Sequence, residues 1–324
     1  MTAPELTRLT SPDGRVEAFV APGQGAELCG LAWDGQELLY RGRDFTPTSG
    51  WSGRAPVLWP AIGRTFAPGP EPTAENFKDA RLGWTHDGRD YAMPMHGFAR
   101  SLPWNVERAT ETSLHLVLSD SDATRGVYPF GFRHALVYAV ENGGLTLRHR
   151  ITASPDNAGE MPFALGNHAT FKLPLLGHGT LEKVQVSTNC DRRIELDAAG
   201  RPNGQVTRCE RFRTETSVSK LVRFDVIALH SDSKPGWARL RQGNLSITVS
   251  HERAVGLEPL QLITLWGDPS DGYLSLEAWV GKPNALASGE GLCRLKPGAT
   301  MDWSLAVVVK AQDSSVDRET GRSA

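Results

Sequence analysis

Short segments in which apolar and polar residues alternate recur along nearly the whole chain. Alternation with a period of two is typical of a strand with one buried face, whereas an amphipathic helix repeats about every 3.6 residues. No stretch keeps a helical period for three or more turns, so we expect little helix. The expected strands are VEAFVAP (16–22), ELLYRG (37–42), SLHLVLSD (113–120), HALVYAV (134–140), LTLRHRI (145–151), LEKVQVS (181–187), LSITVSH (245–251), YLSLEAWV (273–280) and WSLAVVVK (303–310).

Turn signals of the kind that joins antiparallel neighbours separate these segments. They are Asp34-Gly35, Asn142-Gly143-Gly144, Asn203-Gly204 and the run from Asp268 to Gly272. Many strands without a change of composition or a Pro- and Ser-rich linker predict an all-β fold of two packed antiparallel sheets.

We expect a single domain over residues 1–310, followed by a flexible tail over residues 311–324 that lacks large apolar side chains. Residues 66–95 are rich in Pro, Gly and charged residues, and they predict a long loop placed to form the wall of a site.

The charge balance restricts the partners that this chain would bind. Its 35 basic and 37 acidic residues nearly cancel, so it lacks the basic field that draws proteins to nucleic acid or to an anionic membrane. A small neutral or singly charged molecule is the expected partner.

The N-terminal residues lack the basic start and apolar segment of a signal peptide, and no apolar run reaches transmembrane length, so we expect a cytoplasmic protein. The four cysteines lie far apart with no Cys-x-x-Cys spacing, which argues against a zinc ribbon or a disulfide scaffold.

Strand YLSLEAWV carries a carboxylate among aromatic residues. Period-two alternation places Tyr273, Ser275, Glu277 and Trp279 on one face of the strand. A carboxylate beside aromatic rings suits a sugar site, where rings cover the apolar face of a pyranose and polar groups meet its hydroxyls. The alternative is an ordinary polar, solvent-facing side of a strand.

The stretch FALGNHATFKLP, residues 163–174, places a histidine inside a strand-like run. Alternation groups His168 with the small residues Ala164, Gly166 and Thr170, which would leave room for a ligand over the imidazole. A hydrogen-bonded core histidine is the competing interpretation, and this stretch alone does not separate the two.

Two further segments carry candidate site residues. In MPMHGFAR, residues 93–100, His96 precedes Gly97 in a sequence that favours a tight loop. APVLWPAIGR ends in Gly63-Arg64, where an arginine would either reach into a cleft or cap the end of a strand. A structural turn histidine is the alternative for His96.

Common catalytic and cofactor motifs are absent from the sequence. It has no His-Glu-x-x-His, no Gly-x-Ser-x-Gly, no Walker loop and no dinucleotide fingerprint, so we expect no cofactor. His96 and His168 have no close helical spacing and no clear third ligand, so no metal site is predicted.

Taken in order between about residues 10 and 310, these segments resemble the aldose 1-epimerase, or galactose mutarotase, family. The resemblance rests on GAELCGL with ELLYRG, on APVLWPAIGR, on DGRDYAMPMHGFAR, on GNHATFKLP and on LSLEAWVGKPNAL. It implies a β-supersandwich of many antiparallel strands, an active site on a concave sheet face and a monosaccharide substrate.

Carried over residue by residue, the resemblance implies that Glu277 is the catalytic base, His168 the catalytic acid and His96 a second catalytic histidine. The base would take the proton of the C1 hydroxyl while the acid protonates the ring oxygen, and reclosure would give the other anomer.

Three residues are the expected substrate contacts. The resemblance implies that Arg64 binds the substrate, and Asp225 in VRFDVIAL resembles an aspartate that holds sugar hydroxyls. Trp279, on the face of Glu277, is the expected aromatic contact.

Two departures from the family pattern concern substrate preference more than chemistry. Ala169 and Thr170 replace a frequent proline and aromatic residue after the second histidine, and Ala278 replaces a proline after the glutamate.

Two other functions compete with a mutarotase that acts on a free aldose. A hexose-6-phosphate 1-epimerase would use cations from Arg54, Arg64, Arg100 and Lys172, whereas a sugar-binding sensor would keep the site without turnover.

Overall fold

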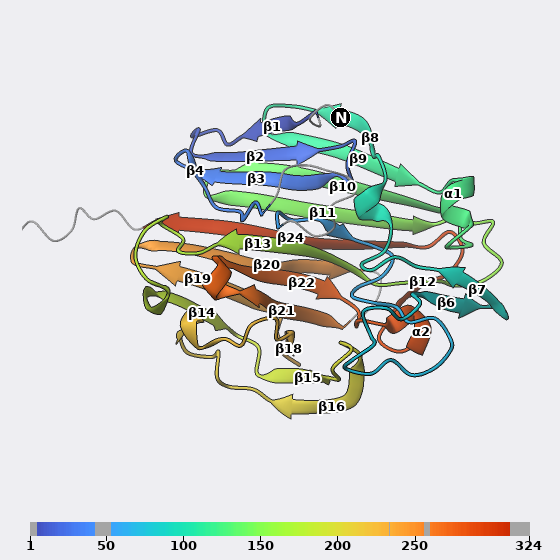
Figure 1. Ribbon diagram of the computed structural model, residues 1–324. Coiled ribbons are helices and arrows are strands. Elements are labelled where there is room, and N and C mark those ends of the chain that lie inside the picture. Colours follow the sequence, from blue (N-terminus) through green and yellow to red (C-terminus); the bar gives the residue numbers. More distant parts are fainter. Residues whose placement is uncertain (1–4, 43–52, 233, 256–259, 312–324) are drawn as a thin grey trace, which may run out of the picture.

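The computed structural model describes residues 5–42, 53–232, 234–255 and 260–311 (Figure 1). The expected tail 311–324 lies outside these residues except for Ala311. Most of the described chain forms antiparallel strands, and the largest two sheets have nine and seven strands. The predicted all-β fold is therefore confirmed.

The nine-stranded sheet has the order β17-β14-β19-β20-β24-β11-β10-β9-β8. Its strands are β8 (Asn105–Ala109), β9 (Ser113–Ser119), β10 (Phe132–Glu141), β11 (Gly144–Ala153), β14 (Val184–Thr188), β17 (Thr216–Ser217), β19 (Trp237–Gln242), β20 (Leu245–Val255) and β24 (Thr300–Ala311).

The seven-stranded sheet has the order β16-β15-β18-β21-β22-β13-β5. Its strands are β5 (Val57–Leu58), β13 (Leu165–Lys172), β15 (Arg192–Leu196), β16 (Pro202–Arg208), β18 (Ile227–His230), β21 (Gln261–Asp268) and β22 (Tyr273–Val280).

Smaller elements complete the described chain. A four-stranded sheet holds β1 (Thr7–Thr10), β2 (Val16–Ala21), β3 (Glu27–Trp33) and β4 (Gln36–Glu37). Two strand pairs join β6 (Gly83–His86) to β7 (Arg89–Ala92) and β12 (Met161–Phe163) to β23 (Cys293–Leu295). The helices are α1 (Asp122–Arg125) and α2 (Ala285–Ser288), and the 3-10 turns are η1 (Ala99–Ser101), η2 (Leu181–Lys183), η3 (Val218–Lys220) and η4 (Pro269–Asp271).

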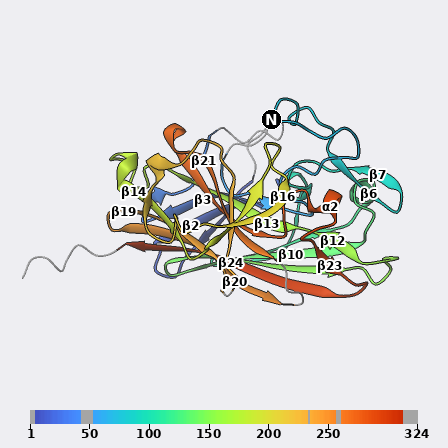
Figure 2. The ribbon, with the colours of Figure 1, turned by 90° about the horizontal axis from the view of Figure 1, so that it is seen from below.

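The two large sheets pack as two layers. Figure 2 shows β10, β20 and β24 in one layer and β13 and β21 in the other. The main core fills the space between them, and it includes Leu165, Phe171 and Leu276 from the seven-stranded sheet. Successive side chains of a strand point to opposite faces. The residues next to these core positions in β13 and β22 therefore point to the outer face of the seven-stranded sheet.

The segment ELLYRG forms less strand than its alternation predicts. Strand β4 covers only Gln36–Glu37, and isolated bridges follow at Leu39 and Arg41. The Glu37 carboxylate accepts hydrogen bonds from the backbone N–H groups of Leu31 and Leu39. A side chain thus replaces the neighbouring strand as the acceptor at this point, and the regular ladder ends.

The turns agree with three of the four predicted signals. Asp34 and Gly35, both with positive φ, join β3 to β4, Asn142-Gly143 joins β10 to β11, and η4 with Gly272 joins β21 to β22. The Asn203-Gly204 prediction is wrong, because these residues lie inside β16.

The reversal between β15 and β16 comes earlier in the chain. There the Asp197 carboxylate accepts from the backbone N–H groups of Ala199 and Arg201 and closes the turn. Within the described residues, no helix has the length and apolar composition needed to cross a lipid bilayer.

Candidate active site

Two neighbouring strands of the seven-stranded sheet bring a carboxylate and an imidazole together. His168 in β13 lies directly opposite Glu277 in β22, so both side chains project from the same face of the sheet. His168 Nε2 and Glu277 Oε1 are 3.5 Å apart. Only 4% of His168 and 1% of Glu277 is exposed. The pair is therefore shielded from bulk water.

The alternation within β22 is confirmed, but the solvent-facing interpretation of its polar side is wrong. Every residue of β22 is buried, including Glu277 and Trp279. Trp279 belongs to a second apolar cluster on the outer face of the sheet, with Leu58 and Leu262 among its members. This cluster covers the face on which Glu277 lies.

Gly166 creates the space that the Trp279 indole occupies. The two residues are opposite each other across β13 and β22, and a Cβ atom on Gly166 would lie 2.7 Å from Trp279 Cδ1. In this position the indole Nε1–H donates to Glu277 Oε2 over 3.1 Å. The room that the sequence predicted beside His168 is thus partly filled by an aromatic ring that orients the carboxylate.

Two hydroxyl groups lie behind the other side of the His168 ring. His168 Nδ1 lies 3.3 Å from Thr170 Oγ1, which in turn lies 2.9 Å from Ser275 Oγ. Contact through Nδ1 fixes the rotation of the ring and leaves Nε2 directed toward Glu277. Thr170, one of the departures from the family pattern, therefore contributes to the orientation of His168.

A strained loop presents the second histidine. His96 has φ of 65° and Gly97 has φ of 75°. Position 97 has no space for a side chain, because a Cβ atom on Gly97 would lie 2.1 Å from the Trp59 carbonyl oxygen. His96 Nδ1 accepts a hydrogen bond of 3.1 Å from the Gly63 backbone N–H. An accepting Nδ1 means that Nε2 carries the ring proton. The His96 ring lies edge-on to His168, with 5.6 Å between centroids.

These side chains line a cavity of about 450 Å³, within the size range of small-molecule sites. Its wall combines the three predicted catalytic residues with two arginines, two tryptophans and a set of small and apolar residues. The lining residues are Gly63, Arg64, Met95, His96, Arg100, His168, Leu196, Ala199, Gly200, Val226, Trp266, Glu277, Trp279 and Pro283.

The predicted polar contacts are divided between the cavity and its surroundings. Arg64 lies in the wall, with its guanidinium 5.0 Å from the centre of the Phe77 ring. Asp225 is not among the lining residues, and its carboxylate accepts from Arg193 over 3.1 Å. Its predicted contact with the substrate stays a prediction.

The four cationic residues considered as ligands for a substrate phosphate are also divided between the cavity wall and its surroundings. Arg100 lines the cavity with Arg64, whereas Arg54 forms a buried ion pair with Glu27 at 3.2 Å and Lys172 is not among the lining residues.

Burial determines the protonation of both histidines. Burial, and after it the positive charge of Arg100, lowers the pKa of His168 to about 3. The pKa of His96 is also held well below its usual value, by burial first and then by His168, Arg100 and Arg64. Both rings are therefore neutral near pH 7 in the free protein.

Burial acts in the opposite direction on the carboxylate. It raises the pKa of Glu277 well above the usual value, and the hydrogen bond from Trp279 only partly opposes this. Both shifts favour the neutral forms, a carboxylic acid and an imidazole, over a carboxylate–imidazolium pair. A carboxyl group and an imidazole that face each other can share the carboxyl proton and exchange it with a ligand at either atom.

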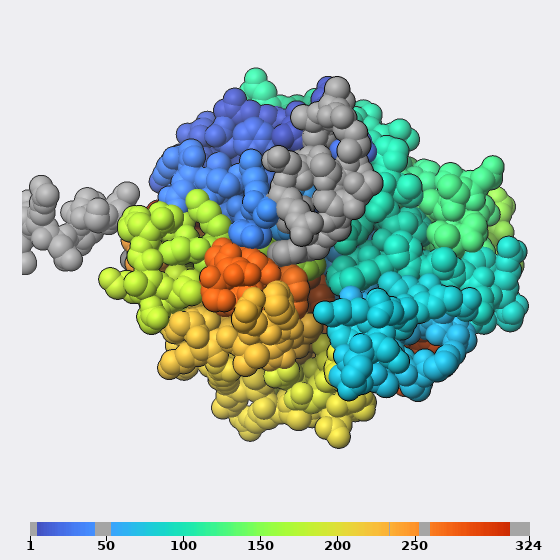
Figure 3. Space-filling model, in the orientation of Figure 1, coloured from blue at the N-terminus to red at the C-terminus, as the bar shows by residue number. Residues whose placement is uncertain are grey.

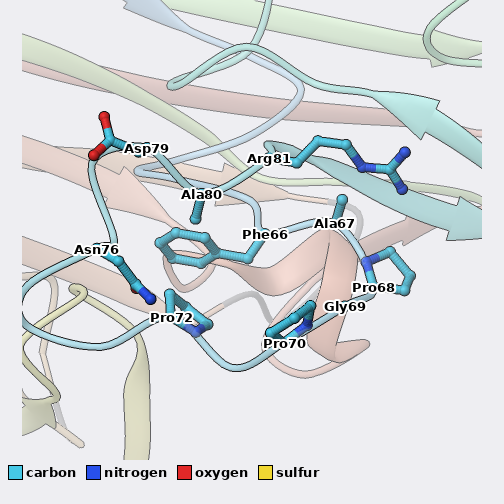
Figure 4. Close-up of a pocket in the computed structure, with 10 residues that line it drawn as sticks. All are labelled: Phe66, Ala67, Pro68, Gly69, Pro70, Pro72, Asn76, Asp79, Ala80 and Arg81. Carbon is cyan, nitrogen blue, oxygen red and sulfur yellow. The ribbon is translucent and has the colours of Figure 1, made fainter.

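Residues 66–95 contribute to the cavity through Met95 alone among the described residues. Residues 66–81 instead enclose a separate cavity of about 340 Å³, where Figure 4 shows Phe66, Pro70 and Pro72 close together. On the face shown in Figure 3, this cyan segment lies beside the yellow segment of β15 and β16. An ion pair between Glu71 and Arg201 joins them.

Several lining residues were not found from the sequence, above all Trp266, which lies 5.5 Å from His168 between ring centroids. Its strand, β21, is buried on both faces, so the alternation that reveals a half-exposed strand is weak there. In the part of the chain that the structure describes, no group of three His, Cys, Asp or Glu side chains is arranged to hold a metal ion.

Comparison with solved structures finds the same fold in several proteins. The Slr1438 protein of Synechocystis sp. PCC 6803 is 25% identical, with a TM-score of 0.76, and the match covers 96% of this chain and 97% of that chain. A galactose mutarotase related enzyme from Lactobacillus acidophilus is 20% identical, with a TM-score of 0.75 and coverage of 95% and 100%. A galactose mutarotase-like protein from Lactobacillus casei ATCC 334 is 22% identical, with a TM-score of 0.75 and coverage of 94% and 100%.

Sequence comparison extends the result from fold to family. No curated protein matches the chain. The family model for aldose 1-epimerase, however, matches residues 9–307, which is nearly the whole chain. The chain therefore belongs to the aldose 1-epimerase family.

Proposed function

We propose that this protein is an aldose 1-epimerase that interconverts the α- and β-anomers of a sugar by acid–base ring opening and reclosure. The observation that carries the proposal is the Glu277–His168 pair, whose facing atoms are 3.5 Å apart in the wall of the cavity. At this spacing the two groups can reach the C1 hydroxyl and the ring oxygen of one hemiacetal, which are bonded to the same carbon.

The shared proton suits this reaction. Transfer of the proton from Glu277 to His168 gives the carboxylate and the imidazolium that ring opening needs. Glu277 then removes the proton of the C1 hydroxyl while His168 protonates the ring oxygen, and the bond between C1 and that oxygen breaks. After rotation about the bond between C1 and C2, reclosure returns both protons and regenerates the pair. The protein gains and loses no proton over the cycle.

His96 is suited to stabilise charge without transferring a proton. Its Nδ1 is occupied by the Gly63 backbone N–H, and its lowered pKa keeps the ring neutral. The Nε2–H group is therefore a hydrogen-bond donor for the partial negative charge that develops on the sugar oxygens.

The proposal is tested by NMR exchange spectroscopy of the α- and β-anomers of glucose, galactose and other free aldoses. We expect the wild type to accelerate exchange and Glu277→Gln to lose about 10²- to 10⁴-fold in kcat, because a well-placed acid or base contributes that much. Unchanged circular dichroism would show that the variant is folded. Sugar binding by the wild type without acceleration would instead support a non-catalytic sugar sensor.

A second candidate, a hexose-6-phosphate 1-epimerase, is favoured by the two arginines in the wall. Among the described residues, neither Arg64 nor Arg100 has a carboxylate within ion-pair distance, and burial lowers the pKa of both. A phosphate group would compensate two desolvated guanidinium groups well. Glucose 6-phosphate in the same NMR panel, with inorganic phosphate as a competitor, distinguishes this candidate from an enzyme for neutral sugars.

A further inference from the structure

An exposed aromatic residue lies beside the cavity and has no role in the proposed reaction. Phe224 is 49% exposed, and its ring centroid lies 5.8 Å from that of Trp266, which lines the cavity next to His168. Phe224 itself is not a lining residue. The aromatic surface that begins at the catalytic histidine therefore continues beyond the cavity.

The backbone holds Phe224 in an unfavourable conformation. Its φ is 58°, a left-handed value that is rare for a bulky residue. The Phe224 backbone N–H donates to the Gly267 carbonyl oxygen over 2.8 Å, which ties this loop to the end of β21. A single exposed apolar side chain needs no explanation, but strained residues fixed by their surroundings are concentrated at ligand sites.

The residue before Phe224 anchors the loop from the side of the sheet. Arg223 Nε lies 2.5 Å from Oδ2 of Asp268, a fully buried carboxylate, and the guanidinium also lies 5.4 Å from the centre of the Phe224 ring. The ring is thus held in place while about half of its surface stays accessible. A preorganised ring loses little entropy when it binds a ligand.

Charged groups border the same loop. Asp225 follows Phe224 and pairs with Arg193 of β15, and the two side chains are 32% and 28% exposed. Val226, the next residue, lines the cavity. A half-exposed aromatic ring with a carboxylate and a guanidinium beside it is suited to a pyranose, which has an apolar face and a rim of hydroxyls.

We propose that Phe224, together with the outer part of Trp266, forms a second sugar-binding subsite at the mouth of the cavity. The substrate is then a disaccharide, which reacts at its reducing sugar. Its reducing sugar lies at Glu277 and His168, its second ring lies on Phe224, and Asp225 and Arg193 bind hydroxyls of that second ring. The glycosidic bond is not broken, because only the hemiacetal of the reducing sugar opens and recloses. This inference rests on the proposed epimerase function.

The test compares anomer exchange for matched sugars: glucose against maltose, cellobiose and lactose, which all carry glucose at the reducing end, and galactose against galactobiose. We expect Phe224→Ala to lower kcat/KM for the best disaccharide by about three- to tenfold, the effect of one aromatic contact, and to leave the matching monosaccharide unchanged. Phe224→Tyr should restore the disaccharide rate.

Two control variants keep the test independent of folding. Phe224→Gly removes the ring and accepts a positive φ without strain, so it should fold well and show the same selective loss. Val222→Ala alters a neighbouring side chain that is 68% exposed and should change neither rate.

The possible results distinguish a failure of the subsite proposal from a failure of the epimerase proposal. Equal losses on mono- and disaccharides, no loss at all, or a wild type that accepts only monosaccharides would overturn the subsite. A wild type that accelerates no anomer exchange would overturn the epimerase proposal itself.

Discussion

Two pairs of buried histidines differ in their surroundings far more than in their burial. His96 and His168 line the cavity on the outer face of the seven-stranded sheet, whereas His134 and His149 lie in the core between the large sheets. In the core pair, His134 Nε2 and His149 Nδ1 are 3.0 Å apart, and His149 stacks on Trp303 at 5.0 Å between centroids.

Burial lowers the pKa of histidines in both places. It lowers the pKa of His149 to about 3, the same value as for His168, and holds that of His134 well below normal. A shifted pKa therefore does not by itself mark a catalytic residue. The difference lies in the partner, because of these four histidines only His168 lines the cavity and also has a carboxylate within ion-pair distance. The comparison predicts that substitutions in the two pairs affect different properties.

The largest effect is expected at the cavity. His168→Asn removes the proposed acid but keeps a polar side chain, so kcat for anomer exchange should fall about 10²- to 10⁴-fold. The midpoint of urea unfolding should stay close to the wild-type value, since the ring is bordered by the cavity rather than packed on every side. A variant with normal turnover would remove His168 from the reaction.

The core pair should show the reverse behaviour. His149→Ala deletes the ring that stacks on Trp303 and leaves His134 without its partner, so the free energy of unfolding should fall by roughly 2–4 kcal/mol. Turnover per folded molecule should not change. Urea denaturation and NMR exchange on the same sample measure both quantities, and loss of activity without loss of stability would contradict a structural role for His149.

Acid should destabilise the fold through the buried histidines. Below pH 6.5 the unfolded chain protonates its histidines, whereas His149 and His251 stay neutral in the folded chain until pH falls to about 3 and 4. The unfolded state then binds more protons, so each such histidine lowers the free energy of unfolding by about 1.4 kcal/mol per pH unit of acidification. Glu277, whose pKa is raised, opposes this trend above its normal pKa, but the buried histidines outnumber it.

The contribution of one histidine can be isolated. In the wild type, unfolding curves between pH 5 and 7.5 should show that the free energy of unfolding falls as the pH falls. In His149→Phe, which keeps a ring on Trp303, the slope of this free energy against pH should be smaller by the equivalent of about one proton. Equal slopes would mean that His149 is protonated in the folded protein.

The smallest effect is expected at Thr170, which lies behind the ring of His168, the proposed acid. Thr170→Val removes the hydroxyl that lies 3.3 Å from His168 Nδ1 while keeping the shape of the side chain. The loss of one neutral hydrogen bond should lower kcat by about three- to tenfold. KM should stay the same if Thr170 acts only through His168, whereas a change confined to KM would indicate a direct contact with the sugar.

Local patterns were sufficient for most of the expected strands and for the faces of the side chains in β22. Alternation in YLSLEAWV correctly placed Glu277 and Trp279 together, and the Asp34-Gly35 and Asn142-Gly143 signals marked real hairpins. Asn203-Gly204 failed because the Asp197 side chain closes the turn before that pair is reached. A competing hydrogen bond from a neighbouring residue is invisible to a dipeptide signal.

By itself, the sequence determined the class of fold and the face of the strand on which each candidate residue lies, because side-chain direction follows directly from a period of two. It also determined the family, through the order of its short motifs. Only the tertiary structure decided that His168 faces Glu277, that Arg100 and Trp266 complete the cavity, and that Asp225 lies outside its wall. These relations depend on strand register and on packing between residues about a hundred positions apart, and no local pattern encodes them.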